Sequence, residues 1–281
     1  MLRESLEYLA IRPHGVYLDA TAGLGGHTLA IAERLTSGLV LACDRDADSL
    51  EQARANTADY SSRIRYRKIL FSQLGEALAA EGISQLDGLL ADLGVSRYQL
   101  TSAERGFSFS ADGPLDMRQD RDQPLTAADI VNFESEHQLA DLIYQFGEER
   151  RSRRIARAVV RARPITTTGQ LAKLIEGAVP RTGKLHPATQ TFMALRIVVN
   201  RELEELDALL ESIPRLVKRG GRAVFITFMS LEDRRVKQAF QAMARAGQAE
   251  ILTRHVIRPT QEEIAENLAS RSAKLRAVQL S

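Results

Sequence analysis

One stretch of the sequence decides the fold: Val16-Tyr17-Leu18-Asp19-Ala20-Thr21-Ala22-Gly23-Leu24-Gly25-Gly26-His27-Thr28. Its first four residues form a short apolar run typical of a β-strand, and the apolar spacing of residues 29–35 predicts a helix after the glycines. A strand, a glycine loop and a helix in this order open the doubly wound α/β folds, whose ligands bind beyond the carboxyl ends of parallel strands. We therefore expect a ligand site at this loop.

Apolar runs of strand length recur along the rest of the chain. They predict strands at residues 38–44, 64–69, 86–92, 222–228, 251–257 and 274–280, with helical patterns between most of them. Short strands that alternate with helices predict βαβ units. We therefore expect a parallel, doubly wound α/β sheet.

The alternation stops in the middle of the chain. Residues 103–186 begin with a polar loop that contains glycine and proline, and they continue with helical patterns near residues 127–132, 135–146, 152–162 and 168–178. We interpret residues 103–186 as an inserted all-helical domain. Residues 1–102 and 187–281 are then two parts of one sheet domain, and a single helix is expected over residues 188–218.

Composition limits the class of protein. The chain has 281 residues, of which 44% are hydrophobic and 26% are charged, so it is long enough for one large core and a second small one. Its formal net charge is only +2, so any nucleic-acid surface must come from local clusters of arginine. No apolar stretch approaches the roughly 20 residues that span a bilayer. We expect a cytoplasmic protein that is neither secreted nor inserted in a membrane.

The single cysteine, Cys43, excludes an internal disulfide and any site built from several cysteines. No metal site is expected. Because Cys43 lies within the predicted second strand, a buried structural role is favoured over that of a nucleophile.

Two cofactors are compatible with the glycine loop. Gly23-x-Gly25 with Asp44 downstream roughly matches the dinucleotide fingerprint, which would indicate an NAD-dependent oxidoreductase. A pyrophosphate, however, needs a helix N-terminus without carboxylates nearby. S-adenosylmethionine carries an ammonium and a sulfonium and suits acids, so Asp19 directly before the loop favours a methyltransferase.

Three predicted strands end in an acid, namely Asp19, Asp44 and Asp92. A lone aspartate after a strand is commonly an N-cap or a turn residue. Three of them at one edge of a parallel sheet favour a binding site for a positively charged ligand instead.

Motifs from nearly the whole chain are specific enough to identify a family. Beside residues 19–28, they are Asp92-Leu93-Gly94-Val95-Ser96, Glu104-Arg105-Gly106-Phe107-Ser108-Phe109, Asp112-Gly113-Pro114-Leu115-Asp116-Met117-Arg118, Gly147-Glu148-Glu149-Arg150, Arg154-Ile155-Ala156-Arg157-Ala158, His186-Pro187-Ala188-Thr189, Ser230-Leu231-Glu232-Asp233-Arg234 and Arg271-Ser272-Ala273-Lys274-Leu275-Arg276. In this order they resemble the bacterial ribosomal RNA small subunit methyltransferase H family. The resemblance implies a Rossmann-like class I methyltransferase sheet with a helical insertion. It also implies S-adenosylmethionine-dependent methylation of the exocyclic N4 amino group of a decoding-centre cytosine in 16S ribosomal RNA.

The resemblance implies a set of cofactor contacts: Gly25, Gly26, His27, Asp44, Phe71, Asp92 and Gln99. Asp44 would accept the ribose hydroxyls and Phe71 would lie against the adenine. Asp92 is expected closest to the chemistry, because a carboxylate that accepts a hydrogen from the amine raises the electron density on its nitrogen.

Substrate contacts are expected after the fourth strand and on an arginine-rich helix. Phe107 or Phe109 would stack on an extruded cytosine, with Arg118 nearby, or these rings would anchor their loop to the helical domain. Seven arginines lie at residues 150, 151, 153, 154, 157, 161 and 163. Of these, Arg150, Arg154, Arg157 and Arg161 are predicted to share one helical face. That face would contact phosphates or be an ordinary solvated surface. Arg271, Lys274 and Arg276 form a second small basic patch.

The implied partner is 16S ribosomal RNA in the small ribosomal subunit, and a homodimer is a further expectation. A second functional class stays open, an S-adenosylmethionine-binding assembly factor with little or no turnover. The sequence departs from the family where Met229 replaces a typical histidine and where Asn267-Leu268-Ala269-Ser270 replaces a proline and an arginine. The family's usual N-terminal stretch with a histidine and a proline does not precede Leu2.

Overall fold

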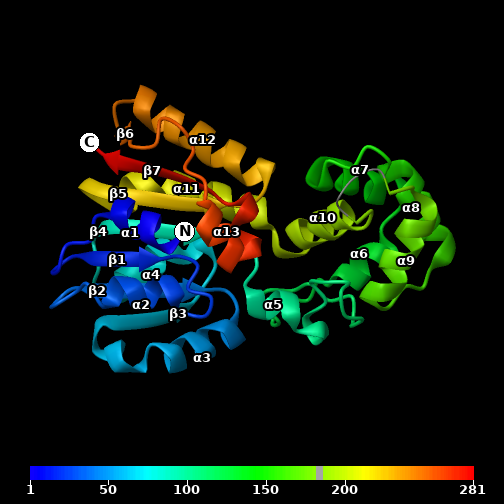
Figure 1. Cartoon of the computed structure of the whole chain (residues 1–281), viewed down its shortest axis with the longest axis horizontal. Helices are drawn as coiled ribbons and strands as arrows, with labels where there is room; N and C mark the ends of the chain where they lie inside the picture. Colours follow the sequence, from blue (N-terminus) through cyan, green and yellow to red (C-terminus); the bar gives the residue numbers. More distant parts are fainter. Residues whose placement is uncertain (182–185) are drawn as a thin grey trace. The chain divides into compact units, whose positions relative to one another are not determined.

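A computed structural model describes residues 1–181 and 186–281. The chain divides into two compact units, one formed by Met1–Gly94 with Glu204–Ser281 and the other by Val95–Leu203. The first unit contains the sheet and the second is helical (Figure 1).

The first unit is built on a seven-stranded sheet with the order β3-β2-β1-β4-β5-β7-β6. Its strands are β1 (Val16–Asp19), β2 (Leu39–Asp44), β3 (Ile64–Lys68), β4 (Leu86–Asp92), β5 (Val217–Thr227), β6 (Ala249–Ile251) and β7 (Lys274–Leu280). Strands β1 to β5 pair in parallel, with Leu18 opposite Leu41 of β2 and Leu89 of β4. The predicted doubly wound α/β sheet is confirmed.

The prediction of a wholly parallel sheet is wrong at its far edge. Strand β7 lies between β5 and β6 and runs antiparallel to both. The strand predicted at residues 251–257 lies earlier and is shorter, because the continuous ladder is formed by Ala249–Ile251. Beyond it the chain still follows β7, since the backbone N–H groups of Leu252 and Ile257 donate to carbonyls of that strand.

Successive residues of the central strands alternate between two apolar cores. Leu18 and Leu89 belong to one core, and Tyr17 and Leu90 belong to the other. The first core is completed by α4 (Leu74–Ala80), α11 (Glu202–Leu216) and α12 (Ser230–Arg245), and the second by α1 (Leu2–Leu9), α2 (Gly26–Ala32) and α3 (Ala47–Asn56). The sheet is therefore covered on both faces, as its apolar strands require. The unit also contains η1 (Ala58–Arg63), η2 (Phe71–Gln73), α13 (Gln261–Glu266) and η4 (Leu268–Ser272).

The second unit is helical and has its own core. It contains α5 (Arg97–Thr101), η3 (Ala103–Arg105), α6 (Ala127–Phe133), α7 (Glu136–Gly147), α8 (Ser152–Ala162), α9 (Thr168–Ala178) and α10 (Thr189–Asn200). Thr126, Ser135 and Thr167 begin α6, α7 and α9 with reciprocal capping boxes. Buried aliphatic residues such as Ile143, Ile155 and Leu171 fill the space between the helices.

The helical unit is wider than the predicted insertion, residues 103–186, of which residues 182–185 lie outside the described part. The helix expected over residues 188–218 is two helices, because Arg201 adopts a left-handed conformation with φ of 49° after Asn200. The side chains of Phe192 and Leu195 on α10 pack in the helical core, so this helix belongs with the insertion.

Asn200 fastens the loop that ends near Gln119 to the helical core. Its Oδ1 accepts from Gln119 N at 2.7 Å, and its Nδ2 donates to Met117 O at 2.8 Å and to Arg196 O at 2.9 Å. Asn200 is fully buried. The loop is thereby held against α10 by side-chain hydrogen bonds.

We expect Asn200→Ala to lower the free energy of unfolding of the protein by about 2 to 4 kcal/mol, because three buried hydrogen bonds are lost together. Urea unfolding measures the change. The control is Asn56→Ala, which removes one exposed hydrogen bond to Leu24 O and should cost less than about 1 kcal/mol. Equal losses in the two variants would contradict this role of Asn200.

Candidate cofactor and active site

The glycine loop lies where the winding of the sheet reverses. Ala20 N donates to Leu90 O of β4 at 2.8 Å, and Ala22 N donates to Cys43 O of β2 at 2.8 Å. The end of β1 thus bonds first to one neighbour and then to the other. In open α/β sheets this reversal point is where ligands bind.

Gly25 and Gly26 of the loop have different structural roles. Gly25 has φ of 89°, and a Cβ there would approach Thr57 Cγ2 to 3.0 Å and Ala53 Cα to 3.3 Å. Gly25 therefore serves the turn and the close packing of the loop on α3. At Gly26, an added Cβ would meet nothing within 4 Å among the described residues, and this residue is exposed. The first turn of α2 accordingly offers backbone that a ligand can approach.

Asp19 is buried beneath the loop. Its Oδ2 accepts from Thr28 Oγ1 at 2.6 Å, and its Oδ1 accepts from Thr21 N at 3.2 Å. Burial raises the pKa of Asp19 to about 6, against the opposing effect of these hydrogen bonds. Because Asp19 is 0% exposed, it holds the loop in place and is not available for direct contact with a ligand.

Asp44 at the end of β2 supports the loop and remains half-buried. Its Oδ2 accepts from Gly23 N at 2.8 Å and its Oδ1 accepts from Asp46 N at 2.9 Å. Burial raises its pKa to about 6. An ionised carboxylate has about four acceptor positions, so Asp44 retains capacity for the hydroxyls of a ligand.

Asp92, directly after Ala91 in β4, is fixed through its backbone. Its N–H donates to Thr21 Oγ1 at 2.6 Å, and its Oδ2 lies 3.7 Å from His27 Nδ1, which is too far for a hydrogen bond. Burial, reinforced by the nearby charge of Asp19, raises the pKa of Asp92 to about 7. Burial lowers the pKa of His27 to about 4, so its imidazole is neutral at physiological pH.

Asp92 and His27 each have one side-chain atom that lacks a hydrogen-bond partner among the described residues. Within residues 1–181 and 186–281, neither Asp92 Oδ1 nor His27 Nε2 has a hydrogen-bond partner, although both atoms are buried. Such atoms cost about 1 to 3 kcal/mol each and call for a functional explanation. A polar ligand at this edge would satisfy them.

Phe71 lies in η2, directly after β3, and packs half-buried against the apolar core of the sheet. The residue after it is tied to α11, because Ser72 N and Ser72 Oγ donate to the carboxylate of Glu205 at 2.9 and 3.1 Å. Glu205 is only 7% exposed. It therefore fixes the turn that carries Phe71.

Sequence reasoning missed three residues of this site: Thr21, Thr28 and Glu205. The threonines belong to the quoted loop, but nothing in the sequence shows that their hydroxyls bond to strand ends. For Glu205 the sequence contains only a weak signal of a buried role, namely an acid flanked by apolar helix positions such as Leu203 and Leu206.

The structure places Gln99 in the helical unit, on α5. Its Oε1 accepts from Ser96 N at 2.9 Å and its backbone N–H donates to Ser96 Oγ at 3.2 Å, which forms a capping box. Gln99 is 4% exposed. These two hydrogen bonds stabilise the start of α5, and a cofactor contact of Gln99 stays a prediction.

Phe107 and Phe109 both pack inside the helical unit. Phe107 is 7% exposed and lies in the core. The half-buried ring of Phe109 lies 4.7 Å from the ring of His186 and 4.9 Å from the ring of Phe192, between centroids. These contacts favour the anchoring role over stacking on a base, most clearly for Phe107.

Arg118 is engaged within its own loop. It forms a bidentate pair with Asp116 at 2.9 and 2.8 Å, and its Nη1 donates to the carbonyls of Arg121 and Gln123 at 3.0 and 2.8 Å. The guanidinium therefore stabilises the loop. Contact with a phosphate would require these bonds to break.

The arginine-rich segment is a helix, but it begins later than predicted. Helix α8 starts at Ser152, so Arg150 lies in the preceding turn and not on the helical face expected for it. Arg154, Arg157 and Arg161 are exposed on α8, which buries Ile155 and Val159 on its other side.

The predicted C-terminal basic patch is partly neutralised. Asp233 on α12 accepts from Arg276 Nε at 2.7 Å and lies 3.5 Å from Lys274 Nζ. Arg271 remains exposed. Since two of the three cations are paired within the sheet unit, the patch is smaller than the sequence indicates.

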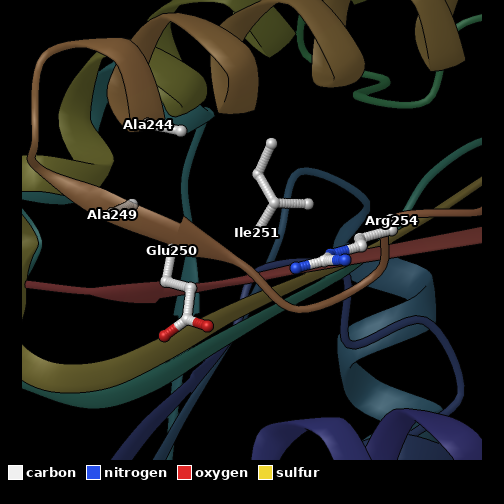
Figure 2. A pocket seen from close by; sticks show the side chains of 5 residues that line it. All are labelled: Ala244, Ala249, Glu250, Ile251 and Arg254. Atoms are coloured by element: carbon white, nitrogen blue, oxygen red, sulfur yellow. The ribbon is translucent and has the colours of Figure 1, made fainter.

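A separate hollow lies at the β6 edge of the sheet (Figure 2). Its lining residues are Ala244, Ala249, Glu250, Ile251 and Arg254. Strand β6 is the last in the sheet order, whereas the acids lie on or directly beside β1, β2 and β4. This hollow is therefore distinct from the ligand edge.

The described part of the chain contains no group of three or more His, Cys, Asp or Glu side chains placed to hold a metal ion. Cys43 is 1% exposed, and burial raises the pKa of its thiol, as suits a structural residue. None of the helices in the two described ranges is long and apolar enough to cross a membrane.

The fold and its acidic edge define a class of protein, the Rossmann-like class I methyltransferases that use S-adenosylmethionine. The MraW methylase family matches residues 1–281. The chain belongs to that family, so the resemblance seen in its motifs is confirmed. The unpartnered atoms of Asp92 and His27 and the open backbone at Gly26 fit a charged, polar cofactor.

Two relatives illustrate the family. The chain is 60% identical over 280 residues to "Ribosomal RNA small subunit methyltransferase H" of Solibacter usitatus, covering 100% of this chain and 98% of the relative. It is 48% identical over 286 residues to the protein of the same name from Acidobacterium capsulatum, covering 99% and 96%. Among solved structures, an rRNA methylase from Streptococcus thermophilus has a TM-score of 0.46 at 12% identity, covering 99% of this chain and 94% of that chain.

We expect Glu205→Ala to weaken binding of S-adenosylhomocysteine about tenfold, because η2 loses the acceptor that fixes Ser72 next to Phe71. Calorimetry measures the dissociation constant. The matched control is Glu204→Ala, an exposed acid on the same helix, which should bind like the unaltered protein. Equal affinities for both variants would exclude a positioning role of Glu205.

Proposed function

We propose that this protein methylates the exocyclic N4 amino group of a decoding-centre cytosine in 16S ribosomal RNA, within the small ribosomal subunit in the cytoplasm. One observation carries the proposal: Asp92 presents a buried, unpartnered carboxylate oxygen at the ligand edge of a methyltransferase sheet. The relatives named for ribosomal RNA small subunit methylation support the class of substrate.

The residues of the sheet unit are suited to hold S-adenosylmethionine. We assign the ribose hydroxyls to Asp44, the adenine to Phe71, and the close backbone approach to Gly25 and Gly26. His27, neutral because burial lowers its pKa to about 4, adds no competing positive charge beside the cofactor. When bound, S-adenosylmethionine supplies an electrophilic methyl group on a positively charged sulfur.

Asp92 then acts on the acceptor. A cytosine amine is a weak nucleophile because its lone pair is delocalised into the ring. The carboxylate of Asp92 accepts one N–H of this amine, orients the nitrogen and takes up its proton as the new bond forms. A pKa near 7 suits this role, since the carboxylate is available near neutral pH and still holds a proton well.

The RNA contacts belong to the helical unit. We assign phosphate binding to Arg154, Arg157 and Arg161 of α8 and to Arg150 before it, since their side chains are exposed. The cofactor contact of Gln99 stays a prediction, as do roles for Phe107, Phe109 and Arg118 at the target base. A homodimer is also a prediction, which sedimentation would test.

Two alternative functions predict different ligand binding and turnover. An NAD-dependent oxidoreductase would bind NAD tightly and S-adenosylhomocysteine not at all, and membership in a methylase family leaves it without support. An assembly factor without turnover would bind the cofactor and the subunit but transfer no methyl group.

The deciding experiment is transfer of labelled methyl from S-adenosylmethionine to small subunits that lack the modification, followed by mass mapping of the product. We expect one methyl group on the N4 amino group of a 16S cytosine. A methyl group on another atom, or no transfer to free RNA or to subunits, would overturn the proposal.

We expect Asp92→Asn to lower the transfer rate at saturating cofactor by about 10²- to 10⁴-fold, because the amide no longer takes up the amine proton. Single-turnover transfer measures the rate, and calorimetry measures cofactor affinity separately. A rate that falls only as much as the affinity does would show that Asp92 serves binding alone.

The preference for S-adenosylmethionine over S-adenosylhomocysteine should rise with pH. Burial raises the pKa of Asp92 to about 7, so the carboxyl is mostly neutral at about pH 6 and mostly charged at about pH 8. The sulfonium gains from the charge, whereas the neutral thioether does not. We expect the affinity ratio, measured by calorimetry, to increase roughly three- to tenfold over this range.

The ratio cancels effects common to both ligands, such as titration of Asp44 beside the ribose. Asp92→Asn should make the ratio independent of pH. A ratio that changes equally in this variant would assign the effect to another group.

A further inference from the structure

One aromatic side chain of the helical unit is exposed without a structural reason. Phe133, the last residue of α6, is 82% exposed, the largest value among the exposed large hydrophobic residues that the structure describes. By contrast, Phe107 and Phe192 are 7% and 5% exposed in the same unit. The ring of Phe133 contributes little to the core, so its position calls for a binding role.

The backbone that carries this ring is held firmly. Arg163 Nε donates to Val131 O at 2.7 Å and its Nη2 donates to Glu134 O at 2.6 Å. The side chain of Asn132 exchanges two hydrogen bonds with the backbone of Ile165, at 2.7 and 2.8 Å. These bonds lie on both sides of Phe133, so the ring is presented to solvent from a well-ordered corner.

The corner, residues 131–136, lies along the C-terminal half of α8. Arg163 contacts its start, and Arg157 Nε lies 3.4 Å from Glu136 Oε1 at its end. Of the exposed arginines of α8, Arg157 therefore reaches the corner that carries Phe133, and Arg154 and Arg161 lie on the same helix. The acids of the corner are Glu134 and Glu136, of which Glu136 is paired with Arg157.

We propose that Phe133 stacks on an unpaired base of an RNA segment whose phosphates contact Arg154, Arg157 and Arg161. Single-stranded nucleic acids are bound by a cationic track combined with aromatic rings, and this corner offers both. A protein partner would prefer a broader apolar patch, because charged residues are depleted at the centres of protein interfaces. This inference rests on the proposed function, in that the substrate is RNA.

The test measures binding of a fluorescent, unpaired RNA of about 12 nucleotides and of a duplex of similar length, at low and moderate salt. We expect Phe133→Ala to weaken binding of the unpaired RNA about tenfold, and to leave the duplex nearly unaffected, since stacking needs a free base face. Phe133→Trp should retain full affinity. The salt dependence should stay unchanged in Phe133→Ala, because phosphate contacts remain.

The matched control is Tyr144→Ala. Tyr144 is a second exposed aromatic residue of the helical unit, 59% exposed on α7, and it is not part of the corner formed by residues 131–136. This variant should bind both RNAs like the unaltered protein. Arg154→Gln with Arg161→Gln should instead reduce the salt dependence for both RNAs.

Three results would overturn the inference: unchanged RNA binding by Phe133→Ala, equal losses for unpaired and duplex RNA, or a changed oligomeric state in sedimentation. The last would assign the ring to an interface between copies of the chain. If the unaltered protein transfers methyl groups to subunits while Phe133→Ala binds RNA normally, only this inference fails. If the unaltered protein neither binds RNA nor transfers methyl, the proposed function fails.

Discussion

The ligand edge depends on one buried carboxylate. Asp19 accepts hydrogen bonds from Thr28 on α2 and from the backbone of Thr21, and the hydroxyl of Thr21 in turn accepts from the backbone of Asp92. Burying a carboxylate without such donors costs several kcal/mol, so these contacts are needed together. The start of α2, the glycine loop and the end of β4 are consequently fixed to the end of β1, and the position of Asp92 follows from a residue that no ligand touches.

This arrangement separates support from function among three similar acids. Asp19 is buried and accepts from Thr28 and Thr21, Asp44 accepts from Gly23 N and Asp46 N and is only half-buried, and Asp92 leaves one buried oxygen unpaired among the described residues. The oxygens of Asp19 and Asp44 accept hydrogen bonds within the protein, whereas one oxygen of Asp92 is left without a donor in the part of the chain that the structure describes. Such an arrangement is organised before a ligand binds. The raised pKa values of all three acids share one cause, which is burial.

Local patterns predicted most of the fold and the place of the site, while features set by distant partners escaped prediction. The glycine loop and the strands ending in Asp19, Asp44 and Asp92 are local signals, and they were interpreted correctly as a doubly wound sheet. The antiparallel β7 depends on pairing with β5, which no local pattern reveals. The helix break at Arg201 occurs at a non-glycine residue, and the pairing of Arg118 with Asp116 depends on loop geometry that no local pattern reveals.

The insertion also bears on the order in which the protein folds. Strands β4 and β5 are parallel neighbours, with Leu89 opposite Ala223, yet the whole helical unit lies between them in the sequence. Contacts between residues so far apart in the sequence slow folding, because a long loop must close before they form. A unit of capped helices instead forms mainly from contacts that are local in the sequence. We expect the helical unit to fold first and to shorten the loop that remains. The first half of the sheet would then leave the ribosome with an open edge, because β4 pairs with β1 but lacks its second neighbour until β5 arrives.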